Sequence, residues 1–222
     1  QGGGSSVGVT SAGEGTVDIG NASRDVKSSE LETFPELQIF TIAYDGIAVV
    51  THPDTELPSL SVEQVRDIFA GKITNWTEVG GQDRPIVLLS RESNSGTHVY
   101  FLESVVRQGD AEDKTLFSPD TLLMPSSEGI SAEIRQNPNA IGYDGLGYVT
   151  DDQKVVAVAR DEGATYVLPT IETVKDNSYP IARGLYIYTA GEPEGAIRAY
   201  LDWILGAQGQ AIVLELGFVP LQ

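Results

Sequence analysis

The residues with the clearest chemical potential lie in the stretch 90–98, Ser-Arg-Glu-Ser-Asn-Ser-Gly-Thr-His. Arg91 carries a fixed, forked cation that suits a planar or tetrahedral oxyanion. Ser95 and Thr97 add hydroxyl donors, and Gly96 lets an anion approach the backbone closely. Together these groups predict a binding site for a tetrahedral oxyanion.

The elements around this stretch place it at the start of a helix. The apolar residues 86–89 predict a buried strand, and residues 99–106 can form an amphipathic helix. Ser95 is then the helix cap, where the first backbone N–H groups are unpaired and the helix dipole is positive. An ordinary loop with a good helix cap and a solvated arginine is the alternative interpretation.

A second group of donors opens the chain. Residues 1–6, Gln-Gly-Gly-Gly-Ser-Ser, have the composition of a phosphate-cradling turn that enters a helix. A flexible N-terminal tail would have the same composition. Residues 16–20 predict a short strand that ends in a polar turn with Ser23 and Arg24, so a hydroxyl and a guanidinium again follow a strand.

Composition and charge limit the classes of ligand. The 222 residues include 32 Asp and Glu against 14 Lys and Arg, a net charge of −18, and no basic cluster occurs in the sequence. Nucleic acid is therefore not an expected partner. An anionic ligand would approach against the overall field, so its binding would depend on local donors.

Cysteine is absent and only two histidines, His52 and His98, occur, which excludes a disulfide framework and a cysteine- or histidine-rich metal centre. No transmembrane run and no signal-peptide pattern is present. We expect that any export signal has been removed from this sequence.

Strand and helix patterns alternate along the chain and predict an α/β fold with largely parallel sheets. A capping box at residues 61–64 starts a helix that runs to Phe69, and Trp76 packs the loop that follows. The other expected strands are 38–44, 46–50, 140–143, 155–158 and 185–189, and the other expected helices are 131–136, 194–205 and 208–216.

Several stretches together resemble one family, the extracytoplasmic phosphate-binding proteins that deliver phosphate to ABC importers. The resemblance spans essentially the whole chain, and its most specific elements are Ile-Thr-Asn-Trp at 73–76 and Arg-x-x-x-Ser-Gly-Thr at 91–97. The supporting stretches are 1–6, 18–24, 45–49, 68–76, 91–97, 140–143 and 209–211.

The resemblance implies a periplasmic-binding-protein fold of type 2, with two α/β lobes, two hinge strands and phosphate enclosed between the lobes. Residues 1–46 and 186–222 would form the first lobe and 47–185 the second, with hinges near 45–48 and 183–186. The resemblance implies no cofactor and no metal. The implied phosphate ligands are Ser5, Ser6, Ser23, Arg24, Asp45, Arg91, Ser95, Gly96 and Thr97.

The sequence departs from the family in two respects. The family begins with a strand and a helix, and a unit of roughly 30 residues by the size of such an element is expected to be missing from the first lobe. At least one phosphate ligand and the segment that could carry a lipid anchor would belong to it. An exposed sheet edge in the first lobe is the expected consequence.

The second departure concerns the proton acceptor that distinguishes phosphate from sulfate. One branch of the family has Asp where this sequence has Arg24. We expect Asp45 to accept the phosphate proton instead and Arg24 to supply a compensating charge, because Asp45 lies at the hinge. Asp45 could also be a turn-forming residue before glycine, and Asp144 is the next candidate for the acceptor.

The leading functional interpretation is a binding protein that passes inorganic phosphate to an ABC-type permease outside the cytoplasm, without chemistry of its own. A binding protein for sulfate, molybdate or tungstate is the first alternative. A phosphate-ester hydrolase or a serine hydrolase using Ser95 and His98 is the second. His98 has no orienting carboxylate nearby in sequence, and neither a Gly-x-Ser-x-Gly elbow nor a metal-ligand cluster occurs.

Overall fold

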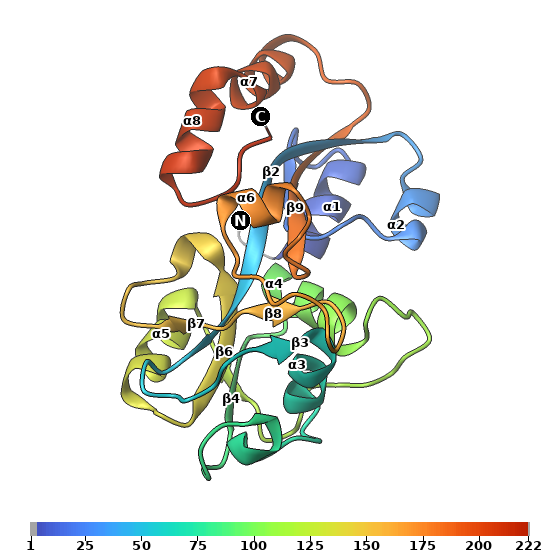
Figure 1. Ribbon diagram of the computed structural model, residues 1–222. Coiled ribbons are helices and arrows are strands. Elements are labelled where there is room, and N and C mark those ends of the chain that lie inside the picture. The colour runs from blue at the N-terminus through green and yellow to red at the C-terminus, as the bar shows by residue number, and fades with distance from the viewer. Residues whose placement is uncertain (1–3, 222) are drawn as a thin grey trace.

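One long strand connects the two halves of the molecule. In the computed structural model, which describes residues 4–221, strand β2 (Leu37–Thr51) runs from the upper lobe into the lower one (Figure 1). Its first part, up to Gly46, pairs with β9 (Ala182–Ala190), and its last part, from Ile47, pairs with β6 (Ala140–Gly145). The strand thus changes partner between Gly46 and Ile47. We propose this point as the boundary between lobes 1–46 plus 186–222 and 47–185.

The main sheet is mixed, so the expectation of largely parallel sheets is wrong. Its strands follow the order β1-β9-β2-β6-β4-β5, with β7 also paired to β2. β2 is antiparallel to β9, β6 and β7, whereas β4 is parallel to β5 and β6. The cause is β2 itself: what looked like two strands in sequence is one element that pairs antiparallel with strands of both lobes. The remaining strands are β1 (Gly20–Ala22), β4 (Val87–Arg91), β5 (Leu122–Met124), β7 (Lys154–Val155) and the separate parallel pair β3 (Leu60–Ser61) and β8 (Val158–Ala159).

Helices cover the sheet in each lobe. In Figure 1 the upper lobe carries α1, α2, α7 and α8, and the lower lobe carries α3, α4 and α5. Among residues 4–221, none of the helices combines the length and the apolar composition that a membrane crossing requires. The helices are α1 (Ser5–Gly13), α2 (Ser28–Thr33), α3 (Val62–Phe69), α4 (Gly96–Phe101), which continues as a π-helical turn (Leu102–Val106), α5 (Ser127–Gln136), α6 (Ile171–Lys175), α7 (Gly195–Leu205) and α8 (Ala207–Glu215), with short 3-10 turns at Trp76–Val79 and Leu146–Tyr148.

Local signals define several helix ends. Ser61 caps α3 as the sequence predicts: its Oγ accepts from the Gln64 N–H at 3.1 Å, and Gln64 Oε1 accepts from the Ser61 N–H at 2.9 Å. The prediction of a strand at 16–20 is wrong, because the N–H groups of Thr16 and Val17 donate hydrogen bonds to the Ser11 carbonyl oxygen near the end of α1. Strand β1 therefore starts only at Gly20.

The core of the lower lobe supports residues 91–97, which we call the donor loop. Phe101 of α4 stacks on Tyr143 of β6 with ring centroids 3.7 Å apart, and Phe69 of α3 packs edge-on against both rings. All three side chains are fully buried. Trp76 is also buried and donates to the Asn139 carbonyl, as expected for the packed loop. Helix α4 is thereby fixed against the strands from which the donor loop emerges.

Candidate functional site

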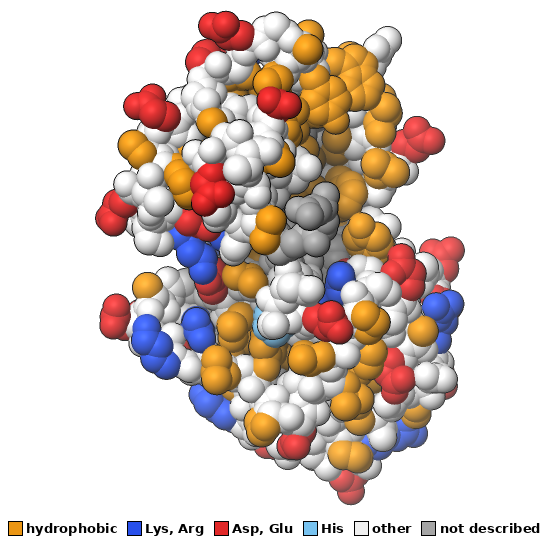
Figure 2. All heavy atoms as spheres, turned by 180° about the vertical axis from the view of Figure 1, so that it is seen from behind, with side chains coloured by type: hydrophobic (Ala, Val, Ile, Leu, Met, Phe, Trp, Pro, Cys, Tyr) orange, Lys and Arg blue, Asp and Glu red, His pale blue; other side chains and the backbone are white. Residues whose placement is uncertain are grey.

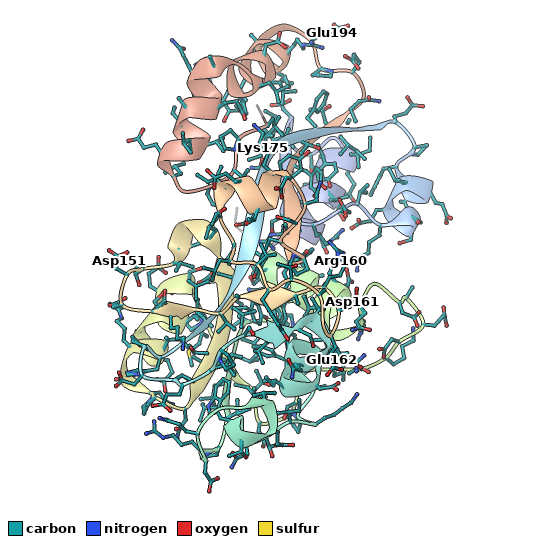
Figure 3. The ribbon with its side chains drawn as sticks, in the orientation of Figure 1. Asp151, Arg160, Asp161, Glu162, Lys175 and Glu194 are labelled. Atoms are coloured by element: carbon teal, nitrogen blue, oxygen red, sulfur yellow. The ribbon has the colours of Figure 1, made fainter. Side chains whose placement is uncertain are left out.

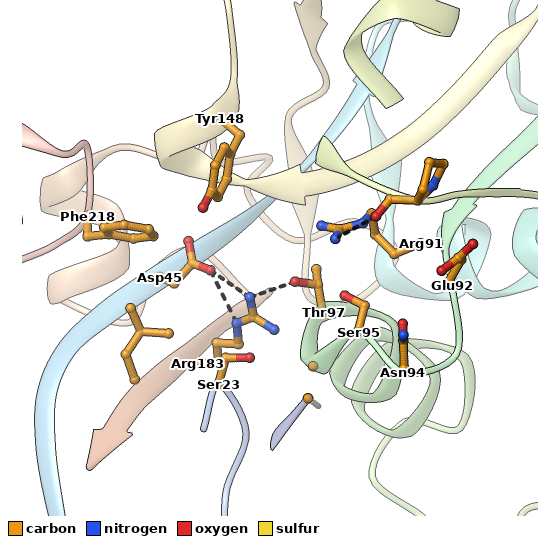
Figure 4. Close-up of a pocket in the computed structure, with 14 residues that line it drawn as sticks. Ser23, Asp45, Arg91, Glu92, Asn94, Ser95, Thr97, Tyr148, Arg183 and Phe218 are labelled. Atoms are coloured by element: carbon orange, nitrogen blue, oxygen red, sulfur yellow. Dashed lines mark hydrogen bonds and ion pairs between the residues drawn. The ribbon is translucent and has the colours of Figure 1, made fainter. Parts of the chain in front are cut away.

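A cavity of about 450 Å³ lies where the two lobes meet (Figure 4). Segments of both lobes contribute to it: the start of α1, the end of β1, the middle of β2, the loop before α4 and the first part of β9. Seen from behind, the molecule narrows between the lobes, and acidic side chains are scattered over both (Figure 2). The lining residues are Gly4, Ser23, Asp45, Arg91, Glu92, Asn94, Ser95, Gly96, Thr97, Pro125, Tyr148, Arg183, Leu185 and Phe218.

The loop before α4 presents its donors to this cavity. Ser95 is the N-cap of α4, with an extended backbone, yet its side chain makes no capping hydrogen bond within the described chain. The Ser95 hydroxyl and the first N–H groups of α4 are therefore available to a ligand. Thr97 lines the cavity from the first turn of the same helix and is nearly buried.

Arg91 reaches the cavity from the end of β4 and is held from behind. Its Nη1 donates to Ser127 Oγ at 2.9 Å, and its Nη2 lies 3.5 Å from the Pro125 carbonyl oxygen. Its Nε is buried and has no partner among residues 4–221. Arg91 thus keeps part of its donor capacity while its guanidinium is oriented.

A second arginine, Arg183 of β9, lines the cavity (Figure 4). Its Nη2 donates to Asp45 Oδ2 and to Thr97 Oγ1, both at 2.9 Å, and its Nε donates to Asp45 Oδ2 at 3.2 Å. Tyr100 packs against its guanidinium, 5.5 Å from ring centroid to Cζ. Its Nη1 is buried and unpartnered in the part of the chain that the structure describes. Sequence reasoning placed Arg183 only at a hinge and missed its contribution to the site.

Asp45 lines the cavity, and its carboxylate forms an ion pair with Arg183. Both groups are buried, and a buried charge is tolerated only when it is paired. Burial raises the pKa of the Asp45 carboxyl, while the adjacent Arg183 charge acts in the opposite direction. Its second oxygen, Oδ1, accepts the Leu146 N–H at 3.3 Å and has no other hydrogen bond among residues 4–221.

The serines of the upper lobe lie over the start of α4. Ser5 Oγ accepts from the Ser23 N–H at 3.0 Å and lies 3.4 Å from Ser23 Oγ. A Cβ on Gly96 would come within 2.2 Å of Ser23 Oγ and 2.5 Å of Ser5 Oγ. Hydroxyls of the upper lobe and the helix start of the lower lobe are therefore adjacent, although Ser5 itself lines a neighbouring cavity rather than this one.

Two predicted residues, Ser6 and Arg24, do not reach the cavity. The Arg24 guanidinium donates to both carboxylate oxygens of Glu30, at 2.7 and 2.9 Å, and to Ser6 Oγ at 3.0 Å. Its side chain is only 3% exposed, so these bonds fix it inside the upper lobe. The charge that compensates Asp45 comes from Arg183, not from Arg24. Gln1, Gly2 and Gly3 of the predicted N-terminal turn lie outside the described residues.

His98 does not face Ser95. Its Nδ1 lies 2.8 Å from the Arg91 carbonyl oxygen and 3.0 Å from Ser90 Oγ. Burial lowers the pKa of His98. Residues 4–221 contain no group of three His, Cys, Asp or Glu side chains that could hold a metal ion. The histidine pairs with Ser90 and the Arg91 carbonyl rather than with Ser95.

The charged groups that line the cavity are the guanidinium groups of Arg91 and Arg183, the buried carboxylate of Asp45 and the exposed side chain of Glu92. Such a set can desolvate and hold a compact oxyanion, because charge-assisted hydrogen bonds replace its water shell.

Comparisons with known proteins all point to the same family of binding proteins. A family model described as a PBP superfamily domain matches residues 1–208. The phosphate-binding protein PstS of Pseudomonas aeruginosa is 31% identical over 242 residues, covering 100% of this chain and 73% of that protein. The protein of the same name from Bacillus subtilis is 33% identical over 222 residues, with 100% and 70% covered.

Solved structures show the same relationship. A phosphate ABC transporter substrate-binding protein from Clostridium perfringens, solved with bound phosphate, is 36% identical with a TM-score of 0.83, covering 99% of this chain and 85% of that one. An ABC-type phosphate transport receptor from Vibrio cholerae is 27% identical with a TM-score of 0.84, covering 99% and 86%.

Proposed function

This chain belongs to the PBP superfamily and, within it, to the phosphate-binding proteins of ABC importers, and we propose that it holds inorganic phosphate in the interlobe cavity. It delivers the anion to an ABC-type permease in the membrane. The capture step takes place outside the cytoplasmic membrane, in the periplasm or at the cell surface. This is a binding function, and the protein performs no chemistry on its ligand.

One observation supports the position of the ligand most directly. The hydroxyls of Ser5 and Ser23 lie over Gly96 at the start of α4, and Arg91 and Arg183 line the cavity beside them. Donors from both lobes thus lie around this cavity, where a tetrahedral anion can accept from those that line it. Closure of the lobes around the anion removes it from water.

Each proposed ligand group has a distinct role. Arg91 gives a charge-assisted contact, Ser95 and Thr97 give hydroxyl donors, and the N–H of Gly96 gives a backbone donor at the positive end of α4. Thr97 Oγ1 already accepts from Arg183, so its own hydroxyl hydrogen is directed elsewhere. From the other lobe, Ser5 and Ser23 complete the cradle.

The Arg91→Ala protein tests this site. Loss of a desolvated, charge-assisted contact should weaken phosphate binding by about 2–5 kcal/mol, measured by isothermal titration calorimetry with inorganic phosphate. Arg160→Ala is the matched control, because Arg160 lies in the exposed loop after β8, beside Asp161 and Glu162 (Figure 3). This variant removes the same charge at an exposed residue that does not line the cavity, and it should leave the affinity unchanged.

Titrations with sulfate and molybdate under the same conditions separate the alternatives. Tight binding of either anion with weak binding of phosphate would replace the proposed ligand and keep the site. An Arg91→Ala protein that binds phosphate as tightly as the parent would refute the site.

A further inference from the structure

A continuous chain of hydrogen bonds runs from Arg91 away from the cavity to a buried carboxylate. Arg91 Nη1 donates to Ser127 Oγ at 2.9 Å, and Ser127 Oγ donates to Asp144 Oδ1 at 2.8 Å. The three residues come from β4, from the start of α5 and from β6. Neither Ser127 nor Asp144 lines the cavity, and they are only 5% and 2% exposed.

The buried position of the Asp144 carboxylate is unfavourable for the free energy of folding. Its Oδ1 accepts from Ser127 and from the Gly145 N–H at 2.9 Å, but its Oδ2 is buried without a partner among residues 4–221. An unpaired, buried carboxylate oxygen opposes folding. Burial raises the pKa of Asp144 to about 6, with Asp45 of β2 acting in the same direction and Ser127, Gly145 and Arg91 acting against it. The fold alone therefore gives no reason for an ionised group at this position.

The favourable effect of Asp144 is found at Arg91, the other end of this chain of hydrogen bonds. Arg91 leaves Nε unpartnered within the described residues, and its Nη2 contact to Pro125 is long, so Ser127 is its best-formed hydrogen bond. A hydroxyl that donates to a carboxylate is a better acceptor for the guanidinium, because hydrogen bonds in series polarise one another. Asp144 fixes the direction of the Ser127 hydroxyl and thereby the direction of its acceptor lone pairs.

We propose that Asp144 is a positioning residue for anion binding, which acts through Ser127 to hold the Arg91 guanidinium in one orientation toward the cavity. This inference rests on the proposed function, since phosphate is the anion that Arg91 would meet. Orienting a long side chain before the ligand arrives lowers the entropy lost on binding. Asp144 itself does not contact the ligand.

The first experiment removes the central link without changing charge. Ser127→Ala should weaken phosphate binding about tenfold in calorimetric titration, because the arginine must then be ordered at the moment of binding. Ser131→Ala is the matched control: Ser131 is a buried serine of the same helix, 5% exposed. It should bind within about twofold of the parent. Equal affinities of the Ser127→Ala protein and its control would overturn the proposal.

A double-mutant cycle then separates positioning from simple charge. Asp144→Asn also removes a negative charge that repels the anion, and that effect is the same whether or not Ser127 is present. The cycle of Asp144→Asn with Ser127→Ala cancels it, and we expect a coupling of about threefold or more in the dissociation constant. Independent, multiplicative effects would show that Asp144 does not act through Ser127.

A ligand-free measurement keeps this inference separable from the proposed function. Carboxyl NMR titration of Asp144 in the absence of phosphate should show its pKa rising in the Ser127→Ala and Arg91→Gln proteins, since each loses a group that favours the carboxylate. No response to either change would overturn the hydrogen-bond chain. A parent protein that failed to bind phosphate, while both variants still raised the Asp144 pKa, would refute the proposed function. That result would support the hydrogen-bond chain from Arg91 to Asp144.

Discussion

At the scale of single residues, the pair of Asp45 and Arg183 organises the cavity. Arg183 donates two hydrogen bonds to Asp45 Oδ2, and within the described part of the chain Oδ1 has one long contact, from the Leu146 N–H. Asp45 can therefore accept one further hydrogen bond on the cavity side. We propose that this buried carboxylate, an acceptor among the donors that line the cavity, distinguishes a protonated anion from a fully ionised one.

Asp45→Asn should narrow the preference for phosphate over sulfate. Near neutral pH phosphate carries at least one proton to donate, whereas sulfate carries none and leaves a buried acceptor unpaired, at a cost of roughly 1–3 kcal/mol. The asparagine can still accept from Arg183 through its carbonyl, and its amide can donate to sulfate. We expect the ratio of the two affinities to fall about tenfold.

Competition titrations of both anions against the parent and the variant measure this ratio. Asp161→Asn, in the exposed loop after β8, controls for the loss of one negative charge. A parental ratio in the Asp45→Asn protein would exclude Asp45 as the acceptor.

At the scale of elements, the starts of α1 and α4 meet across the boundary between the lobes. Gly4, the N-cap of α1, has a φ of 80°, and a Cβ there would come within 2.1 Å of the Asn94 carbonyl oxygen. Gly96 is similarly enclosed by the hydroxyls of Ser5 and Ser23. Glycine at both positions lets two helix starts approach one ligand from opposite lobes.

Gly96→Ala should therefore weaken phosphate binding about tenfold or more, the scale of a typical overpacking cost. Ser23 Oγ could rotate away from the new methyl group, but Ser5 Oγ is held by the Ser23 N–H. The lobes would close less completely around the anion. Calorimetric titration measures the loss.

Gly129→Ala is the control for this substitution. Gly129 lies in the first turn of α5, and a Cβ there would meet its neighbours only at 3.5 Å or more. Phosphate affinity should be unchanged in that protein. Equal binding by both alanine variants would mean that the lobes need not approach at Gly96.

At the scale of the whole molecule, attraction is local and the overall field is repulsive. The net charge is −18, and acidic side chains are distributed over both lobes (Figure 2). Arg91 and Arg183, which line the cavity, oppose that field at short range. Binding strength and association rate should therefore respond differently to salt.

The association rate of phosphate should increase as sodium chloride is raised from about 10 to 200 mM, because the Debye length shrinks from about 30 to below 10 Å and screens the distant acidic groups. Stopped-flow measurement of ligand binding at constant pH tests this. A rate that falls with salt, as for attractive steering, would contradict it.

Local sequence determined the parts of this protein that depend on neighbouring residues. The donor loop before α4, the capping box of α3 and the packed loop at Trp76 were predictable, because caps and hydrophobic periodicity are read within a few positions. The resemblance to phosphate-binding proteins rested on such contiguous motifs and is confirmed by the family match.

Tertiary structure alone decided how distant side chains pair. Arg183 meets Asp45 across 138 positions, and Ser127 joins Asp144 across 17, distances over which no local pattern specifies a contact. Arg24 had the residue type of an anion ligand, but Glu30 pairs with it inside the upper lobe. The sheet is mixed for the same reason: the direction of a strand depends on its partners, and β2 pairs with strands from both lobes.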